Sequence, residues 1–345
     1  MLKRLTPREQ FEALLSEFEP LIRKAFLEAV ADLRSGVDLG RLIEHLERRE
    51  IDRAIDALNI DRSAYSRLDE AIARAYSGGG QATTGNMPTL RDPNGAKVII
   101  RFDAQAFRAL EWFRLHGLAD RMVEIDKDAA RLMIIDGIDK GKGARRVGLD
   151  LAGRMNKLTR RREGGVIGLN VPQAQHVISM RERLSSGDPD EMRKVFTMGR
   201  RDKRFDRTIT RAIEAKKPVS AEDIDRLAAR YSDRLLDLRG KTIAKTEGMA
   251  AFNAAAIEAY EQAIDKGAVN EADLEKTWRA SMRNTRDTHI ALNGTKVGFR
   301  ADFVSPSAAV MKHPHDPDAP ASERVNCECR MDITIDFLAR FRRRG

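Results

Sequence analysis

An alanine-rich stretch, KTIAKTEGMAAFNAAAIEAY (241–260), limits what this chain can fold into more than any other segment. Its apolar residues recur at spacings of three, four and seven, which predicts one buried face of an α-helix. These residues are Ile243, Ala250, Ala254 and Ile257. Glu247 lies on the same face, four residues after Ile243 and three before Ala250. Because an unpaired buried carboxylate is costly, the rest of the fold must supply this acid with a partner.

Thr246 and Asn253 add two further polar groups beside that face. Buried polar groups are nearly always hydrogen-bonded, so we expect partners from later in the chain. The segments SMRNTRDTH (281–289) and VNCECR (325–330) offer suitable side chains. We therefore predict a structural polar network in which Arg286 pairs with Glu247 and ties the helix to a sheet. The predicted members are Thr246, Glu247, Asn253, Arg286, His289 and Asn326.

The fold class follows from composition and periodicity. Charged residues make up 33% of the chain and aromatic residues 6%, which is typical of a helix-rich protein with solvated faces. Strand candidates are few: 97–103, 276–282, 295–304 and 330–337. We predict a predominantly α-helical α+β protein, with an N-terminal helical region and a C-terminal domain of long helices packed on a small antiparallel sheet.

Changes in composition suggest boundaries along the chain. The segment SGGGQATTGNMPTLRDPNG holds many glycines, two prolines and few apolar residues, which predicts a linker or hinge. The predicted regions are an N-terminal helical region 1–76, a Gly/Pro-rich linker 77–96, a helical middle region 97–215, a core domain 216–337 and a basic tail 338–345.

The chain is basic, with 62 Lys and Arg against 53 Asp and Glu, a net charge of +9 and a pI near 9.6. This balance favours a polyanionic partner such as nucleic acid. Basic clusters bind phosphate backbones through charge without reading sequence, although a solvated helix face explains any single cluster equally well. The predicted DNA-phosphate contacts are Arg145, Arg146, Arg160, Arg161, Arg162, Arg200, Arg201, Lys203 and Arg204.

Cys327 and Cys329 are the two cysteines of the chain, too few for a disulfide framework, so we expect folding in a reducing cytoplasm. No signal-peptide core and no long apolar window is present, and we expect no contact with a membrane. With His289 the two thiols form a ligand set that suits structural zinc, which His313 or His315 could complete. The alternative is no cofactor, with two small half-buried thiols and a locally bonded histidine.

The order of several short motifs resembles a known family. IAKTE, Asn253, Trp278, TRDTHIALNG and NCEC follow one another as in the phage head morphogenesis family, the minor head proteins typified by the F protein of phage Mu. The resemblance covers roughly residues 125–337. The chain departs from the family pattern at Met282, where the family has Asp, at Asn284, where it has Arg, and at Glu328, where its NCRC motif has Arg. A role that needs the missing Asp as ligand or catalyst is therefore not expected.

The resemblance implies a minor capsid protein of a tailed phage or prophage. Such a protein is incorporated with the portal protein during head assembly and lies inside the head near the portal vertex and the packaged double-stranded DNA, where it influences DNA packaging and ejection. Scaffold or major capsid protein are further implied partners. The location would be the virion, preceded by the host cytoplasm during assembly.

The sequence predicts no enzyme activity, because it shows no nucleophile beside a base, no HExxH motif and no glycine-rich cofactor loop. Two other functions are compatible with the residues. One is a metal-dependent nuclease or toxin-like enzyme that uses Glu247, His289, Cys327 and Cys329. The other is a host DNA-binding protein without any portal partner.

Overall fold

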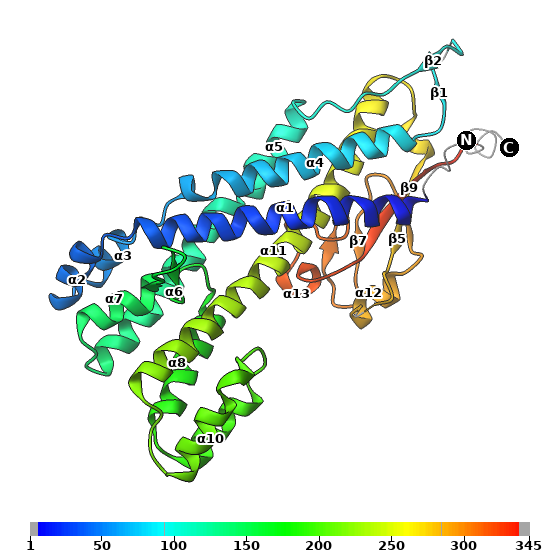
Figure 1. Ribbon diagram of the computed structural model, residues 1–345. Helices are drawn as coiled ribbons and strands as arrows, with labels where there is room; N and C mark the ends of the chain where they lie inside the picture. Colours follow the sequence, from blue (N-terminus) through cyan, green and yellow to red (C-terminus); the bar gives the residue numbers. More distant parts are fainter. Residues whose placement is uncertain (1–5, 93, 284, 338–345) are drawn as a thin grey trace. The chain divides into compact units, whose positions relative to one another are not determined.

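Figure 1 shows the computed structural model of the chain, which describes residues 6–92, 94–283 and 285–337. The predicted fold class is confirmed, because helices dominate and the strands form small antiparallel sheets. The chain divides into two compact units. The first comprises the described residues of 1–23, 69–117 and 241–345, and the second comprises 24–68 and 118–240.

This division differs from the consecutive regions predicted from composition. Each unit collects segments that are far apart in sequence, because its helices pack on partners that local composition does not reveal. The predicted basic tail, 338–345, lies outside the described residues.

Four helices are long: α1 (Pro7–Gly36), α4 (Ser66–Asn86), α6 (Leu118–Asp139) and α11 (Ala221–Asp265). The shorter ones are α2 (Leu39–Glu47), α3 (Ile51–Asp56), α5 (Phe107–His116), α7 (Ala144–Ala152), α8 (Val171–Ser185), α9 (Pro189–Arg193), α10 (Asp206–Glu214), α12 (Asp287–Leu292) and α13 (Ala321–Arg324). Within the described ranges, none has both the length and the apolar content that a membrane crossing requires.

The strands are short: β1 (Leu90–Arg91), β2 (Lys97–Val98), β3 (Arg154–Met155), β4 (Arg162–Glu163), β5 (Leu274–Arg279), β6 (Lys296–Gly298), β7 (Phe303–Val304), β8 (Val310–Met311) and β9 (Arg330–Ile335). They form three two-stranded pairs and one three-stranded sheet of order β6-β5-β9, all antiparallel. The long register of β5 with β9 runs from Leu274 opposite Ile335 to Arg279 opposite Arg330.

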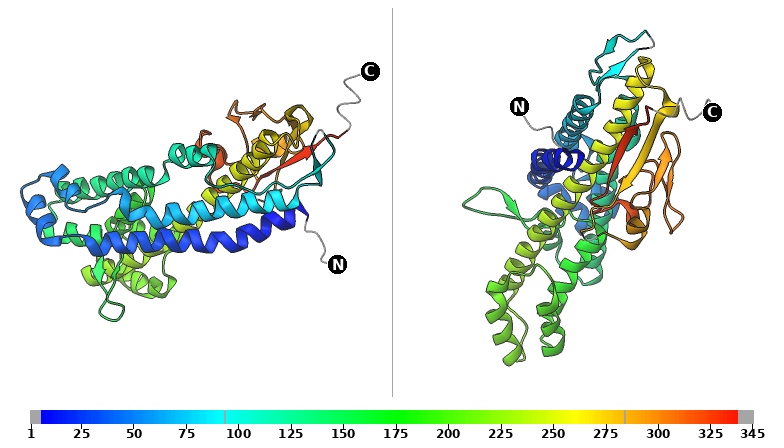
Figure 2. Two further views of the ribbon diagram at one scale, coloured as in Figure 1. Left: turned by 90° about the horizontal axis from the view of Figure 1, so that it is seen from above. Right: turned by 90° about the vertical axis from the view of Figure 1, so that its right-hand side faces the viewer.

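The helix predicted over 241–260 is the second half of α11. In the first unit it lies beside β9, as both views of Figure 2 show in yellow and red. The amide N–H of Met331 donates to Asn253 Oδ1 at 3.2 Å, and the Tyr260 hydroxyl donates to the carbonyl of Ile333 at 3.3 Å. Polar side chains of the helix therefore fix the edge strand of the sheet, and apolar side chains fill the space between them. One buried cluster joins Ala259, Tyr260 and Ala263 of the helix to Leu274 and Phe299. A second cluster contacts the helix through Ile257 and consists of Trp278, Leu292, Phe303, Met311, Ala319, Cys327, Cys329 and Met331.

The predicted linker is wrong for residues 77–86, which form the second half of α4. Its glycines are sites of close packing within the first unit. A Cβ atom on Gly78 would lie 2.7 Å from the ring of Phe18, and one on Gly80 would lie 2.3 Å from the ring of Phe102. Both distances are shorter than van der Waals contact, so only glycine lets these rings reach the helix backbone.

The strand predicted over 97–103 is reduced to β2. The chain beyond it packs on α11 and bonds to a side chain there. The amide N–H of Asp103 donates to Gln262 Oε1 at 2.9 Å, and Gln262 Nε2 donates to the carbonyl of Asp103 at 2.8 Å. The backbone hydrogen bonds of this segment are thus made with a glutamine instead of a neighbouring strand.

In the second unit, charged side chains hold the glycine-rich loop 164–168. Asp233 accepts the amide N–H of Gly164 at 3.0 Å, and Arg34 donates to the carbonyl of Ile167 at 3.1 Å. Arg239 donates to the carbonyl of Gly168 at 2.6 Å and pairs with fully buried Asp126 at 2.8 Å. These buried groups satisfy one another, which is the condition under which charges are tolerated in a core.

Candidate metal centre

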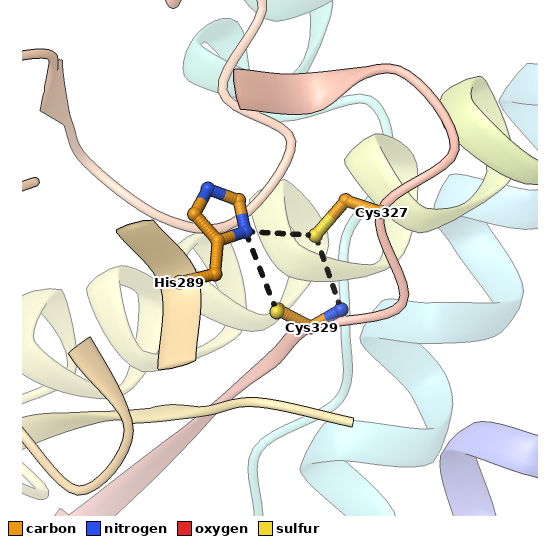
Figure 3. Close-up of side chains that lie close together, drawn as sticks. All are labelled: His289, Cys327 and Cys329. Carbon is orange, nitrogen blue, oxygen red and sulfur yellow. Dashed lines mark hydrogen bonds between the residues drawn. The ribbon is translucent and has the colours of Figure 1, made fainter. Parts of the chain in front are cut away.

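His289, Cys327 and Cys329 lie together in the first unit, as Figure 3 shows. His289 Nδ1 lies 3.2 Å from Cys327 Sγ and 3.5 Å from Cys329 Sγ. The amide N–H of Cys329 donates to Cys327 Sγ at 3.3 Å, which folds the C-x-C segment so that both sulfur atoms point the same way. The three side chains come from α12 and from the loop before β9, and they are 0%, 6% and 0% exposed.

These separations fit one face of a metal tetrahedron. Zinc binds sulfur at about 2.3 Å and imidazole nitrogen at about 2.0–2.1 Å, so two such ligands of one ion stand about 3.6 Å apart. The observed nitrogen-to-sulfur distances of 3.2 and 3.5 Å are close to that value. The three candidate ligand atoms all lie within 4.8 Å of one another.

Glu323 lies on the other side of the imidazole. One of its carboxylate oxygens lies 2.8 Å from His289 Nε2. Thr288 Oγ1 donates to Glu323 at 3.0 Å, and Ser307 donates to it at 2.5 Å. Burial acts to raise the pKa of Glu323, but these hydrogen bonds outweigh it and the pKa lies below its ordinary value.

The two thiols share a hydrogen bond that separates their acidities. It lowers the pKa of Cys329 to about 5, because the Cys327 side chain donates to the thiolate and His289 adds to the effect, although burial opposes it. The same hydrogen bond raises the pKa of Cys327. The pair is thus suited to hold one thiolate beside the imidazole, and thiolate is the form of cysteine that binds metals.

His313 and His315, the other histidines considered as ligands, bond elsewhere. His313 Nδ1 lies 2.8 Å from the carbonyl of Pro314, and His315 Nε2 lies 2.8 Å from the carbonyl of Cys327. Burial lowers the pKa of His315 to about 3, so this ring is neutral at physiological pH. Among the described residues, His315 therefore supports the backbone of the cysteine loop, and the ligand cluster contains neither histidine.

The predicted polar network exists with changed partners. Asn326 donates its amide N–H to Thr246 Oγ1 at 3.2 Å, which joins the cysteine loop to α11. Asn253 receives the Met331 amide at the start of β9. The loop that carries the two cysteines is therefore fixed to the helix on both sides of Cys327 and Cys329.

The predicted Arg286–Glu247 pair is wrong. Glu247 is buried as expected, at 4% exposed, but it lies 3.0 Å from His116 Nε2 and 3.8 Å from Arg324. Arg286 donates instead to the carbonyl of Val325 at 2.8 Å. Val325 follows the last residue of α13, so its carbonyl lies outside the helical ladder and needs a donor of this kind.

His116, Glu323 and Arg324 were missed as site residues. His116 stacks on Trp112 with ring centroids 4.6 Å apart, and it ends a helix that lies 131 residues before Glu247. No local pattern connects residues so far apart. A signal for Glu323 and Arg324 did exist, because both immediately precede the VNCECR motif and carry charges into a loop of otherwise small residues.

The predicted DNA contacts all belong to the second unit and fall into two groups. Four are engaged with protein groups: Arg146 with Asp225, Arg162 with the Gly153 carbonyl, Arg201 with Asp206, and Arg204 with Asp202. The others are exposed and form no salt bridge within the described part of the chain. They are Arg145, Arg160, Arg161, Arg200 and Lys203. These five side chains therefore have no acidic partner within the described part of the chain.

Comparison with known proteins gives two matches, both partial. A Bacillus subtilis (strain 168) protein, "Uncharacterized protein YqbB", is 37% identical over 102 residues, which are 28% of this chain and 31% of that protein. The chain thus spans less than a third of the length of this relative. No solved structure matches.

The second match is to a family. It begins in α9 and ends within β9, so it includes the whole of α11, the sheet and the histidine–cysteine cluster. Its extent is narrower than the predicted resemblance over roughly 125–337, but it contains every motif from which that resemblance was inferred. Residues 190–332 match the family described as Phage Mu protein F like protein, and the predicted family resemblance is confirmed for this segment.

Proposed function

We propose that the chain is a minor head protein of a tailed phage or prophage, built into the head together with the portal protein. The observation that carries this proposal is the family match over 190–332, because that segment contains the α11–sheet body and its buried polar contacts. Scaffold and major capsid protein are further partners of the proposed assembly. The proposed location is the interior of the head near the portal vertex.

The proposed role is architectural. The three candidate metal ligands are at most 6% exposed and Glu247 is 4% exposed, so a substrate cannot reach them without unfolding their surroundings. Purified chain supplied with zinc or magnesium should accordingly leave plasmid DNA intact. Metal-dependent cleavage that EDTA stops would favour the nuclease alternative.

Proximity to packaged DNA is the second part of the proposal. It is supported by the net charge of +9 and by the exposed arginine and lysine side chains of the second unit that form no salt bridge among the described residues. Such side chains can contact phosphate. Contacts of this kind are independent of DNA sequence, which suits a genome packaged without regard to register. Influence on packaging or ejection of DNA would follow from that position.

The direct test is genetic. A nonsense mutation in the gene, within the phage or prophage that encodes it, should abolish or strongly reduce infectious particles, and the full chain supplied in trans should restore them. Mass spectrometry of purified wild-type particles should detect the chain. A full titre from the mutant, together with absence of the chain from particles, would contradict the proposal.

The portal partnership needs a separate experiment. The chain and the portal protein of the same phage, co-expressed with a tag on the portal, should co-purify at high salt. Salt-resistant association would separate a specific protein contact from joint binding to DNA, because DNA-mediated contacts weaken steeply as salt rises. Release of the chain at high salt would argue for the alternative of a DNA-binding protein without a portal partner.

A further inference from the structure

We propose that His289, Cys327 and Cys329 bind one zinc ion, through Nδ1 and the two sulfur atoms, and that this ion is a structural clasp of the first unit. The proposal stands on the cluster itself and does not depend on the proposed role in the phage head. It concerns how the C-terminal part of the chain is held together.

The geometry is the first support. His289 and the two cysteines, which follow it by 38 and 40 residues, converge with their ligand atoms within 4.8 Å. The three side chains are nearly inaccessible to water there. The nitrogen-to-sulfur separations are those of ligands on a shared ion. A hydrophobic core does not by itself gather two thiols and an imidazole tip to tip, because each polar tip loses hydration on burial.

The donor types select the metal. Thiolate and imidazole together suit zinc, whereas magnesium and calcium prefer oxygen ligands. Two thiolates also balance the double positive charge of the ion. The ion and its three ligands would therefore carry no net charge, and such a group can be buried at far lower cost than a bare ion. When bound, zinc would supply cross-linking through its bonds to the two sulfurs and the nitrogen.

The surroundings of His289 are the third support. Metal-binding imidazoles commonly face a carboxylate with their second nitrogen, and Glu323 occupies that position at 2.8 Å. Glu323 is itself held by Thr288 and Ser307. Trp278 packs edge-on against the ring, with centroids 4.9 Å apart, and limits its rotation. The imidazole is therefore aimed at the sulfurs before any ion arrives.

The consequence is mechanical. His289 belongs to α12, while the cysteines belong to the loop that bonds to α11 through Asn326 and continues into β9. An ion on these ligands would connect α12 to the loop and, through it, to the long helix. Because the ligand set is assembled only in the folded chain, binding of the ion should raise the stability of this part of the chain considerably.

Metal content is the primary test. Full-length chain purified under reducing conditions and dialysed against metal-free buffer should retain about one zinc per chain by elemental analysis. Cys329→Ser and His289→Ala should each lower this content at least tenfold. Gln262→Ala is the matched control, because it also replaces a buried polar side chain of the first unit, but one that bonds to Asp103 and Glu258 and not to the cluster. Equal zinc in the wild type and in Cys329→Ser would overturn the proposal.

Two further measurements keep the test valid if a ligand variant folds poorly. Cobalt-substituted wild type should show a thiolate-to-cobalt charge-transfer band, and its absence would contradict sulfur ligation. Glu323→Gln keeps all three ligands and should weaken zinc binding about 10- to 100-fold in a chelator competition. Unchanged affinity would remove the carboxylate from the proposed site, and a chelator that leaves the melting temperature of the wild type unchanged would rule out a structural role.

Discussion

A single buried acid, Glu247, shows how strongly one residue can constrain a fold. Its place on the apolar face of a helix predicted burial, and it is 4% exposed. The positions of its two partners were not predictable, because His116 precedes it by 131 residues and Arg324 follows it by 77. Periodicity reports which face of a helix is buried, but it carries no information about what packs there.

We predict that Glu247→Ala lowers the free energy of unfolding by about 3 kcal/mol, because it leaves buried His116 and Arg324 without their acid. Guanidinium titration at pH 7 would measure this loss. The control is Glu12→Ala, whose exposed pair with Arg8 should contribute less than about 0.5 kcal/mol. Equal losses in the two variants would show that the buried contacts of Glu247 contribute nothing beyond a surface pair.

Asp202 should make stability depend on pH. A hydrogen bond from Arg204, reinforced by Arg234, lowers the pKa of this acid from 3.8 to about 2 in the folded protein. Its stabilisation is therefore fully present above the unfolded pKa and disappears as the pH falls towards 2. Asp202→Asn should cost about 1 kcal/mol at pH 7, since its arginine partners are exposed, and the cost should vanish near pH 2. Urea unfolding across this range measures it, and Asp190→Asn is a surface control. A loss independent of pH would contradict the electrostatic explanation.

At the scale of elements, glycines had opposite meanings in two segments. In 77–86 their density predicted a linker, but they form the part of α4 on which Phe18, Phe102 and Phe252 pack. In 164–168 the glycines lie in a loop, which Asp233 and buried Arg34 of the second unit hold through hydrogen bonds. Composition cannot distinguish these cases, because a glycine that breaks a helix and one that admits a ring look identical until the packing partner is known.

Gly168→Ala should destabilise the second unit by about 3 kcal/mol. This residue has a φ of +91°, and a Cβ atom on it would lie 2.5 Å from Val30 and 2.9 Å from Leu236. Backbone strain and steric overlap therefore act together. Gly199→Ala is the control, because no atom lies within 4 Å of a Cβ at that position. We expect its unfolding midpoint in guanidinium to match the wild type within error, and a comparable shift in both variants would contradict the packing argument.

Helices and strands with strong periodicity were predictable, and so was the ligand set of the candidate metal centre. The stripe in 241–260 and the alternation in 330–337 correspond to α11 and β9. The types His289, Cys327 and Cys329 were sufficient to predict a cluster before any distance was known. Glu323, the acid beside His289 Nε2, was not predicted, because single carboxylates before a motif are common and the short helix α13 that carries it has no periodic signal.

At the scale of the whole molecule, the sequence gives the net charge directly. The structure adds which basic side chains have acidic partners and which do not. The net charge of +9 says nothing about where phosphate would bind. Many basic side chains are already paired with acids along the same helix, as in Arg8–Glu12, Arg48–Glu44 and Arg74–Glu70. Such ion pairs contribute little to the attraction of a polyanion, because their charges cancel. Basic side chains without an acidic partner on one unit attract it together.

We therefore predict that DNA binding depends on those basic side chains of the second unit that have no acidic partner, and not on the total charge of the chain. One variant replaces Arg145, Arg160, Arg161, Arg200 and Lys203 with alanine. Its control replaces five basic residues that have acidic partners with alanine: Arg8, Lys24, Arg48, Arg53 and Arg74. Each variant lowers the net charge from +9 by five, to +4.

Fluorescence anisotropy with duplex DNA over a range of salt concentrations would compare the two variants. If each of these five basic side chains contacts one phosphate, the magnitude of the slope of log affinity against log salt should fall by about 4.5 in the first variant, because each neutralised phosphate contributes about 0.9. The control variant should keep nearly the wild-type slope, because the five basic side chains that it lacks are paired with carboxylates in the wild type. An equal decrease of the slope in both variants would mean that DNA affinity depends on the overall charge of the chain. The second unit would then not be the preferred DNA-binding surface.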